Sequence, residues 1–213
     1  MITVKNFIFN PFQENTYLLF DESGECIIID PGCYEEDERL ELENFISKNN
    51  LKPVGIVNTH SHVDHILGNA WFKAKYNVPV YASKKDAHIL ATSVEHGRMY
   101  GIVLTEPPVI DIDIDSSSVI TFGNSSLKVL DIPGHTPGCV GLYNEQQKFV
   151  FSGDILFKGS IGRTDLPGGD YDQIIDSIKN KLCKLGNDYI VFAGHGGPSE
   201  IGIEMVTNPF LTH

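Results

Sequence analysis

Apolar residues along the chain fall into short runs that are separated by polar turns, which is the pattern of β-strands in an α/β protein. In the first half, runs of strand length occupy 2–9, 17–21, 26–30, 54–58 and 78–82. In the second half, they occupy 119–122, 127–132, 140–143, 149–152 and 189–192. Between these sets, isoleucine and aspartate alternate in a loop at 107–115 that is half strand in character. The pattern predicts two β-rich halves, 1–115 and 116–213, without a linker, and therefore one domain.

Helices are predicted where apolar positions recur every three or four residues. The predicted helices are 35–49, 66–76, 84–95, 171–185 and 201–206. The apolar stripe of the first helix is expected to consist of Leu40, Leu42, Phe45 and Ile46. Ser83 and Ser199 stand just before the third and last helices, where a serine side chain can cap free backbone N–H groups.

Composition narrows the class of protein and its partners. The chain is 41% hydrophobic and 21% charged, as is usual for a globular protein, and its formal net charge is −12. That charge repels phosphate backbones, so we expect no nucleic-acid partner. No run approaches the ~20 apolar residues of a membrane span, and the first residues do not resemble a signal peptide. Four cysteines without C-x-x-C spacing favour a reducing compartment, so we expect a cytoplasmic protein with no membrane partner.

The densest chemistry follows the apolar run at 54–57. His60, His62, Asp64 and His65 form the pattern H-x-H-x-D-H within six residues. Imidazole and carboxylate at this density suit zinc, iron or manganese, while the lack of thiolates argues against a closed structural zinc site. The alternative, polar residues on a solvated loop, explains such clustering at a strand end poorly.

This motif resembles the signature of the metallo-β-lactamase superfamily. The resemblance extends over 6–211 and is greatest to the short, single-domain glyoxalase II-like hydrolases. It implies an α/β fold of the αββα type, in which two mixed β-sheets pack face to face with helices outside.

Later motifs supply the remaining ligands. His135 lies between two Pro/Gly turns in G-H-T-P-G, and adds a third nitrogen to His60 and His62. The resemblance further assigns Asp154, in S-G-D, as a carboxylate shared by two metals, and His195 as a ligand beside Asp64. The implied sites are His60, His62, His135 and Asp154 for one metal, and Asp64, His65, Asp154 and His195 for the other. Two divalent cations are thus expected, zinc first, with iron and manganese as alternatives.

Arg163 is the remaining residue implied by the resemblance. It stands where glyoxalase II enzymes place a basic residue that holds the glutathione part of the substrate, and guanidinium suits a carboxylate. The alternative is a structural ion pair with Asp165. Asp165 also replaces a tyrosine of the larger enzymes, and their C-terminal helical domain has no counterpart here. Both departures leave the thiol half of the substrate open.

Other residues carry weaker signals. Asp30 ends the third predicted strand and is expected either to orient a ligand histidine or to cap a turn. Segment 11–17 also matches the glyoxalase II-like proteins, and we interpret it as a connector followed by an edge strand. His88 and His96 fall outside every motif and are expected on the solvated surface.

These residues favour a hydrolase in which a metal-bridging hydroxide, oriented by Asp64, attacks a thioester. The resemblance implies S-lactoylglutathione as the small-molecule substrate; the oligomeric state is left open. A second hypothesis is a persulfide dioxygenase, which would use one iron held by His60, His135 and Asp154. A third is a non-catalytic metal-binding domain, which would not need an open position for water.

Overall fold

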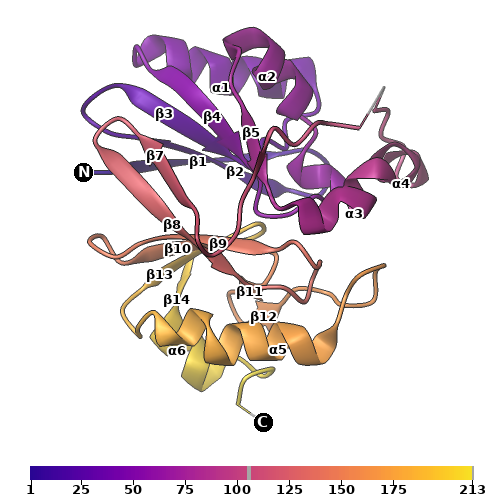
Figure 1. The fold of residues 1–213 in the computed structure, drawn as a ribbon, viewed down its shortest axis with the longest axis vertical. Helices are drawn as coiled ribbons and strands as arrows, with labels where there is room; N and C mark the ends of the chain where they lie inside the picture. Colours follow the sequence, from indigo (N-terminus) through magenta and orange to yellow (C-terminus); the bar gives the residue numbers. More distant parts are fainter. Residues whose placement is uncertain (105–106, 213) are drawn as a thin grey trace.

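The expected αββα sandwich is confirmed. The computed structural model describes residues 1–104 and 107–212, and shows two six-stranded mixed sheets packed against each other (Figure 1). Helices α1 and α2 cover the outer face of the first sheet, and α5 and α6 lie beyond the second (Figure 1). The described chain has no helix that is long and apolar enough to cross a membrane.

The first sheet has the order β1-β2-β3-β4-β5-β6. Its strands are Thr3–Phe9, Glu14–Phe20, Glu25–Ile29, Lys52–Val57, Val80–Ala82 and Ile112–Asp113. The first three are antiparallel, whereas β3 to β6 run parallel, so β4 and β5 end at the same edge. Strand β2 begins earlier than predicted and pairs on both sides. The expectation of an edge strand after residue 11 is therefore wrong.

The second sheet has the order β14-β13-β10-β9-β8-β7. From β7 to β10 its strands are Val119–Phe122, Ser125–Asp131, Val140–Asn144 and Phe149–Gly153, and β13 and β14 are Ile190–Ala193 and Ser199–Glu200. A separate hairpin pairs β11 (Leu156–Phe157) with β12 (Ser160–Ile161). The sequence did not predict β11, β12 or β14, because two residues are too few to show a period.

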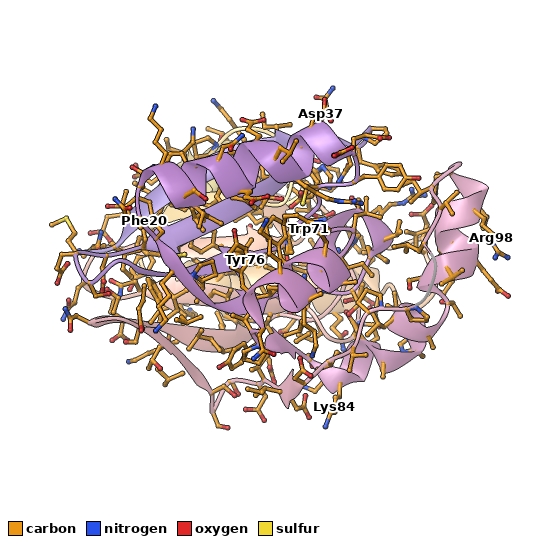
Figure 2. All side chains as sticks on the ribbon, turned by 90° about the horizontal axis from the view of Figure 1, so that it is seen from above. Phe20, Asp37, Trp71, Tyr76, Lys84 and Arg98 are labelled. Carbon is orange, nitrogen blue, oxygen red and sulfur yellow. The ribbon has the colours of Figure 1, made fainter. Side chains whose placement is uncertain are left out.

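Helix α1 (Glu36–Lys48) begins at a capping box in which Glu35 and Glu38 bond each other's backbone. Its inner face buries Leu42 and Ile46, but Leu40 is 44% exposed and does not belong to the expected stripe. Helix α2 (Asn69–Tyr76) begins three residues later than predicted, because the 3-10 turn η1 (Val63–His65) precedes it. Figure 2 views these two helices from above, side by side.

The predicted helix at 84–95 is divided into three pieces. These are η2 (Lys84–Asp86), α3 (Ala87–Ala91) and α4 (Ser93–Met99). Ser83 caps the first piece, since its hydroxyl accepts a hydrogen bond from the backbone of Lys85. Figure 2 shows Arg98 projecting outward from α4.

The C-terminal helices are also shorter than predicted. Helix α5 (Tyr171–Asn180) is followed by a 3-10 turn η3 (Leu182–Lys184). Helix α6 (Ile201–Thr207) has Glu200 at its N-cap, and Ser199 belongs to β14. Ser199 therefore does not cap the helix; its hydroxyl bonds to the buried carboxylate of Glu204 instead.

The largest group of buried residues lies between the sheets and draws on both of them. Leu19 and Ile29 of the first sheet pack with Phe122, Leu142 and Phe151 of the second. Separate apolar layers fill the spaces under α1 and α2, and under α5 and α6. Burial of these apolar side chains favours folding by the hydrophobic effect, and their close packing fixes the position of one sheet relative to the other.

Candidate metal centre

The expected ligands meet where strands of both sheets end. Strands β4, β8, β10 and β13 are followed, in that order, by His60 and His62, His135, Asp154, and His195. Because β10 and β13 are parallel with Gly153 opposite Ala193, Asp154 and His195 leave the sheet close together. Residues far apart in the sequence are thereby collected at one place.

The first group consists of three buried histidines. One nitrogen each from His60, His62 and His135 lies within 4.8 Å of the other two. The three residues are 1%, 8% and 3% exposed. The Nδ1 atom of His62 is 2.7 Å from Nε2 of His135. This is the three-histidine group that the sequence predicts.

The second group contains Asp64, His65 and His195, whose ligand atoms also lie within 4.8 Å of one another. Asp64 Oδ2 is 3.2 Å from His195 Nε2 and 3.5 Å from His65 Nε2. His65 is fully buried, but the side chains of Asp64 and His195 are 14% and 27% exposed. This group is therefore open on one side.

Asp154 lies between the two groups. Its Oδ2 is 3.6 Å from Nε2 of His135 and 3.5 Å from Nε2 of His195, while Oδ1 is 3.5 Å from Nε2 of His65. One carboxylate thus faces both groups, as a shared ligand would. Gly194 permits this approach, since a Cβ atom there would lie 2.2 Å from Asp154 Oδ1.

The Nδ1 atoms of three proposed ligand histidines form hydrogen bonds with residues outside the two ligand groups. Nδ1 of His65 donates to Asp30 at 3.1 Å, and Nδ1 of His135 donates to the carbonyl of Arg163 at 2.7 Å. Nδ1 of His195 donates to the carbonyl of Phe12 at 3.1 Å. A carbonyl can only accept, so Nδ1 of His135 and of His195 is the donor in these bonds, and the Nε2 atom of each ring is directed toward the centre. Metal-ligating histidines are typically oriented in this way.

Several buried atoms at the centre lack a hydrogen-bond partner among the described residues. These are Nε2 of His60, His62 and His65, and Oδ1 of Asp154. A buried polar atom without a partner is costly, and such atoms call for a ligand. Nitrogen lone pairs and a carboxylate that face one another fit divalent cations, so the residues present suit the metals that the sequence implies.

The two groups differ in electrostatics. Burial lowers the pKa of His60 well below its ordinary value and that of His62 to about 3, with neighbouring histidines adding to the effect. Burial also acts to lower the pKa of His65, but Asp64 and Asp154 outweigh it and raise that pKa well above its ordinary value. His60 and His62 therefore favour the neutral form with free lone pairs, whereas the carboxylates of Asp64 and Asp154 favour a charged His65.

Asp30 orients His65 of the second group through a hydrogen bond with its Nδ1 atom. It accepts hydrogen bonds from the backbone and hydroxyl of Thr59 at 2.7 and 2.6 Å, besides the bond from His65. Of the two roles expected for Asp30, the structure shows that it orients a histidine. Thr59 Oγ1 lies 3.1 Å from Nδ1 of His60, so the same carboxylate also supports the first group.

Glu14 is a buried residue at this site that the sequence analysis missed. It is 0% exposed, its Oε2 accepts from the hydroxyl of Thr16, and its Oε1 lies 3.9 Å from Nδ1 of His65. Burial raises the pKa of Glu14 well above its ordinary value. The neighbouring Asn15 donates to the carbonyls of Ala193 and Gly196, on either side of His195. The polar run Gln13-Glu14-Asn15 was the available signal.

Comparison with known proteins decides the family. The model of the metallo-beta-lactamase superfamily matches residues 9–195. The chain belongs to this superfamily. Hydroxyacylglutathione hydrolase GloC of Haemophilus influenzae is 36% identical over 207 residues, which are 94% of this chain and 93% of that protein.

Solved structures of the superfamily superpose closely on this chain. The B3 metallo-beta-lactamase BLEG-1 has a TM-score of 0.89 and 35% identity, covering 99% of this chain and 100% of that one. TTHA1623 in a di-iron-bound form has a TM-score of 0.87 and 36% identity, covering 98% and 100%. The chain is thus similar over nearly its whole length to a hydroxyacylglutathione hydrolase, a B3 metallo-beta-lactamase and a protein that binds two iron ions.

A cavity of about 410 Å³ opens above the centre of this superfamily member. Its apolar wall is formed by Phe12, Val63, Tyr100, Phe157, Ile161 and Leu166. The rings of Phe12 and Tyr100 meet edge to face at 5.3 Å. His62, Asp64, His135, Asp154 and His195 line the cavity as well. Both ligand groups are therefore reachable from one apolar pocket.

Arg163 and His96 also line this cavity. Arg163 forms a two-pronged ion pair with Asp165, with both N–O distances at 2.7 Å, on an exposed part of the rim. The ion pair with Asp165, which was the structural alternative for Arg163, is thus formed in the fold. His96 is half-buried at the pocket, so its expected surface position is wrong, whereas His88 is exposed as expected.

Proposed function

We propose that this chain is a metal-dependent thioester hydrolase of the glyoxalase II type, acting on S-lactoylglutathione or a related small-molecule thioester. One observation carries the proposal. Seven metal-capable side chains converge with unpartnered nitrogens and a shared carboxylate beneath an apolar cavity. A structural metal site would not need such an opening. The 36% identity to a hydroxyacylglutathione hydrolase supports the thioester class.

We assign two divalent cations to the centre. His60, His62, His135 and Asp154 would hold one, and Asp64, His65, His195 and Asp154 the other. Zinc suits these ligands, and the di-iron form of a 36% identical protein supports iron as the alternative. When bound, a pair of cations supplies Lewis acidity that can lower the pKa of water from about 15.7 toward 7.

The chain's own residues then position the reactants. Neutral His60 and His62 offer lone pairs without losing a proton, and Asp64, at the open side, orients the attacking water. The apolar wall around Phe12 and Tyr100 excludes bulk water and strengthens the electrostatic interactions within. A thiol leaving group has a pKa of about 8.5, so it departs without a general acid.

β-Lactam hydrolysis is the second candidate, and the 35% identity to a B3 metallo-beta-lactamase favours it. Cleavage of a lactam releases an amine nitrogen, which needs a proton during departure. No residue described at the centre is placed as a dedicated acid: His65 and His195 are themselves ligands in our assignment, and His65 is also fully buried. We therefore rank the thioester first.

Arg163 is proposed to contact the thiol half of the substrate, since it lines the cavity. Its pairing with Asp165 lies on the rim, so a substrate carboxylate can share or replace that partner. The four cysteines are free, which fits a reducing compartment, and we propose a cytoplasmic location.

The test is a substrate panel on protein loaded with zinc, and separately with iron. We expect turnover of S-lactoylglutathione at a kcat/KM at least about 100-fold above that for the β-lactam nitrocefin. Preference for nitrocefin would move the chain to the second candidate. Oxygen consumption with glutathione persulfide and no hydrolysis would favour the dioxygenase, and inertness on all three substrates would favour a non-catalytic metal-binding domain.

A further inference from the structure

Asp86 is a buried carboxylate that the ligand assignment does not use. It ends η2, at the edge of the first sheet where β5 also ends, and it is 0% exposed. It belongs to none of the metal-capable groups found among the described residues. Burying an ionisable group is unfavourable unless its charge is stabilised by hydrogen bonds, so the contacts of Asp86 indicate its role.

The side-chain hydrogen bonds described for Asp86 all go to the two loops that carry the first ligand group. Its Oδ2 accepts from the backbone N–H of Ser61 at 3.1 Å and from the hydroxyl of Thr136 at 2.7 Å. Its Oδ1 accepts from the backbone N–H of Gly138 at 2.6 Å. Ser61 stands between His60 and His62.

The second loop contacts this carboxylate closely. Thr136 follows His135 directly, and a Cβ atom at Gly138 would lie 2.5 Å from Cγ of Asp86. Between the two loops themselves, the one backbone–backbone hydrogen bond described runs from the N–H of Val140 to the carbonyl of Thr59, at 2.9 Å. Asp86 therefore spans the gap between a loop of the first sheet and a loop of the second.

We propose that Asp86 is a positioning residue that sets the separation of His60 and His62 from His135, and thereby the affinity of the first cation. The inference rests on the proposed function only in taking these histidines as ligands. The carboxylate touches neither metal nor substrate. It acts by fixing two backbone segments whose side chains must meet at one point, as in the contact of His62 with His135.

Asp86→Asn tests this role with little change in volume. The asparagine amide keeps one acceptor oxygen, but its NH₂ group replaces the other oxygen and cannot accept a hydrogen bond from a backbone N–H. If the amide nitrogen replaces Oδ1, the N–H of Gly138 loses its acceptor; if it replaces Oδ2, the N–H of Ser61 does. Either way, one of the two loops is released.

The matched control is Asp21→Asn. Asp21 is likewise buried, at 5% exposure, and likewise bonds two turns, accepting from Ser23, Asn124 and Ser125. Those turns carry none of the proposed ligands. The control removes a comparable network without touching the ligand loops.

The measurement is zinc titration of the full chain, without substrate, against a chromophoric chelator, together with the visible spectrum of the cobalt(II) form. We expect Asp86→Asn to weaken the binding of one cation by about 10- to 100-fold and to alter the cobalt spectrum. Asp21→Asn is expected to bind both cations as the wild type does. Wild-type affinity in Asp86→Asn, or an equal loss in Asp21→Asn, would overturn the proposal.

A second variant applies if Asp86→Asn does not fold. Thr136→Val removes a single bond to the carboxylate at constant shape, and we expect about a fivefold loss of affinity for one cation. Unchanged affinity in this variant would contradict the role of Asp86. A wild-type chain that binds no zinc would instead contradict the proposed function itself, so the two failures are distinguishable.

Discussion

The two ligand groups of this centre are built from similar residues but in different surroundings. His60, His62 and His135 are almost fully buried, and the pKa values of His60 and His62 are lowered. In the other group, Asp64 and His195 are partly open to the cavity. The first group is thus enclosed almost like a protein core, and the second forms part of the wall of a pocket. We therefore expect the cation of the first group to be held more tightly and the cation of the second group to exchange more readily, although both groups border the cavity.

The largest effect is expected from the residue that the groups share. Asp154→Ala removes a carboxylate that lies within 3.6 Å of both groups. We expect loss of both cations and a fall in hydrolysis of about 1,000-fold or more, since the rate depends on the charges at the centre. His135→Ala should be nearly as severe. Metal analysis and S-lactoylglutathione assays measure both effects, and full activity in either variant would refute the ligand assignment.

His195→Ala separates the groups directly. Because His195 belongs to the open group alone, we expect this variant to retain one cation per chain and lose the other. Activity should fall by about 100-fold or more, because losing a ligand is expected to cost at least as much as losing a residue that only supports one. Equilibrium dialysis followed by elemental analysis reports the stoichiometry. Retention of both cations at wild-type affinity would show that the groups are not independent in the way their burial suggests.

A smaller effect is expected at the rim of the open group. Arg163→Ala should raise KM for S-lactoylglutathione by about 10-fold and leave kcat nearly unchanged, because it removes binding that is equal in ground and transition states. Asp165→Ala is the matched control, since it frees the guanidinium from its ion pair. We expect that control to keep or lower KM. If KM were unchanged in Arg163→Ala, the structural role of Arg163 would be favoured.

The smallest effect is expected far from both groups. Burial tends to raise the pKa of Asp21, but hydrogen bonds from Ser23, Ser125 and Asn124 outweigh it, and the pKa lies below its ordinary value. A lowered pKa in the folded state means that Asp21 stabilises the fold fully above pH ~4 and less as the pH falls further. Asp21→Asn should lower Tm by about 3 °C at pH 7, and the difference should shrink in acid. A constant difference down to pH 2 would contradict the assigned cause.

Much of this architecture is predictable from the sequence, for identifiable reasons. Strands such as β7 (Val119–Phe122) are predicted to the residue, because alternating burial leaves a period in the sequence. Breaks inside helical patterns, such as that at Thr92 between α3 and α4, are missed, because apolar spacing continues across them. Leu40 fits the apolar spacing of α1, yet it lies on the solvent side.

At the site, the proposed metal ligands were predictable because they lie in recognisable motifs. The residues that hold those ligands in place were not predictable. The segment His60 to His65 shows its chemistry locally. Asp86 acts through partners that are 25 or more residues away, so no local pattern reveals it. Glu14 has only the polar run at 13–15 as a local signal, and that run does not indicate its approach to His65. Their acidic side chains would have been expected on the surface. Only the packing of two sheets shows why they are buried.

We propose that two cations occupy unlike halves of one centre and together support hydrolysis of a thioester. Metal content per chain on anaerobically purified protein, with S-lactoylglutathione turnover in the same sample, tests it most directly. We expect about two cations per chain, and removal of the more weakly held one should abolish most of the turnover. One iron per chain, no hydrolysis, and oxygen consumption with glutathione persulfide would contradict it.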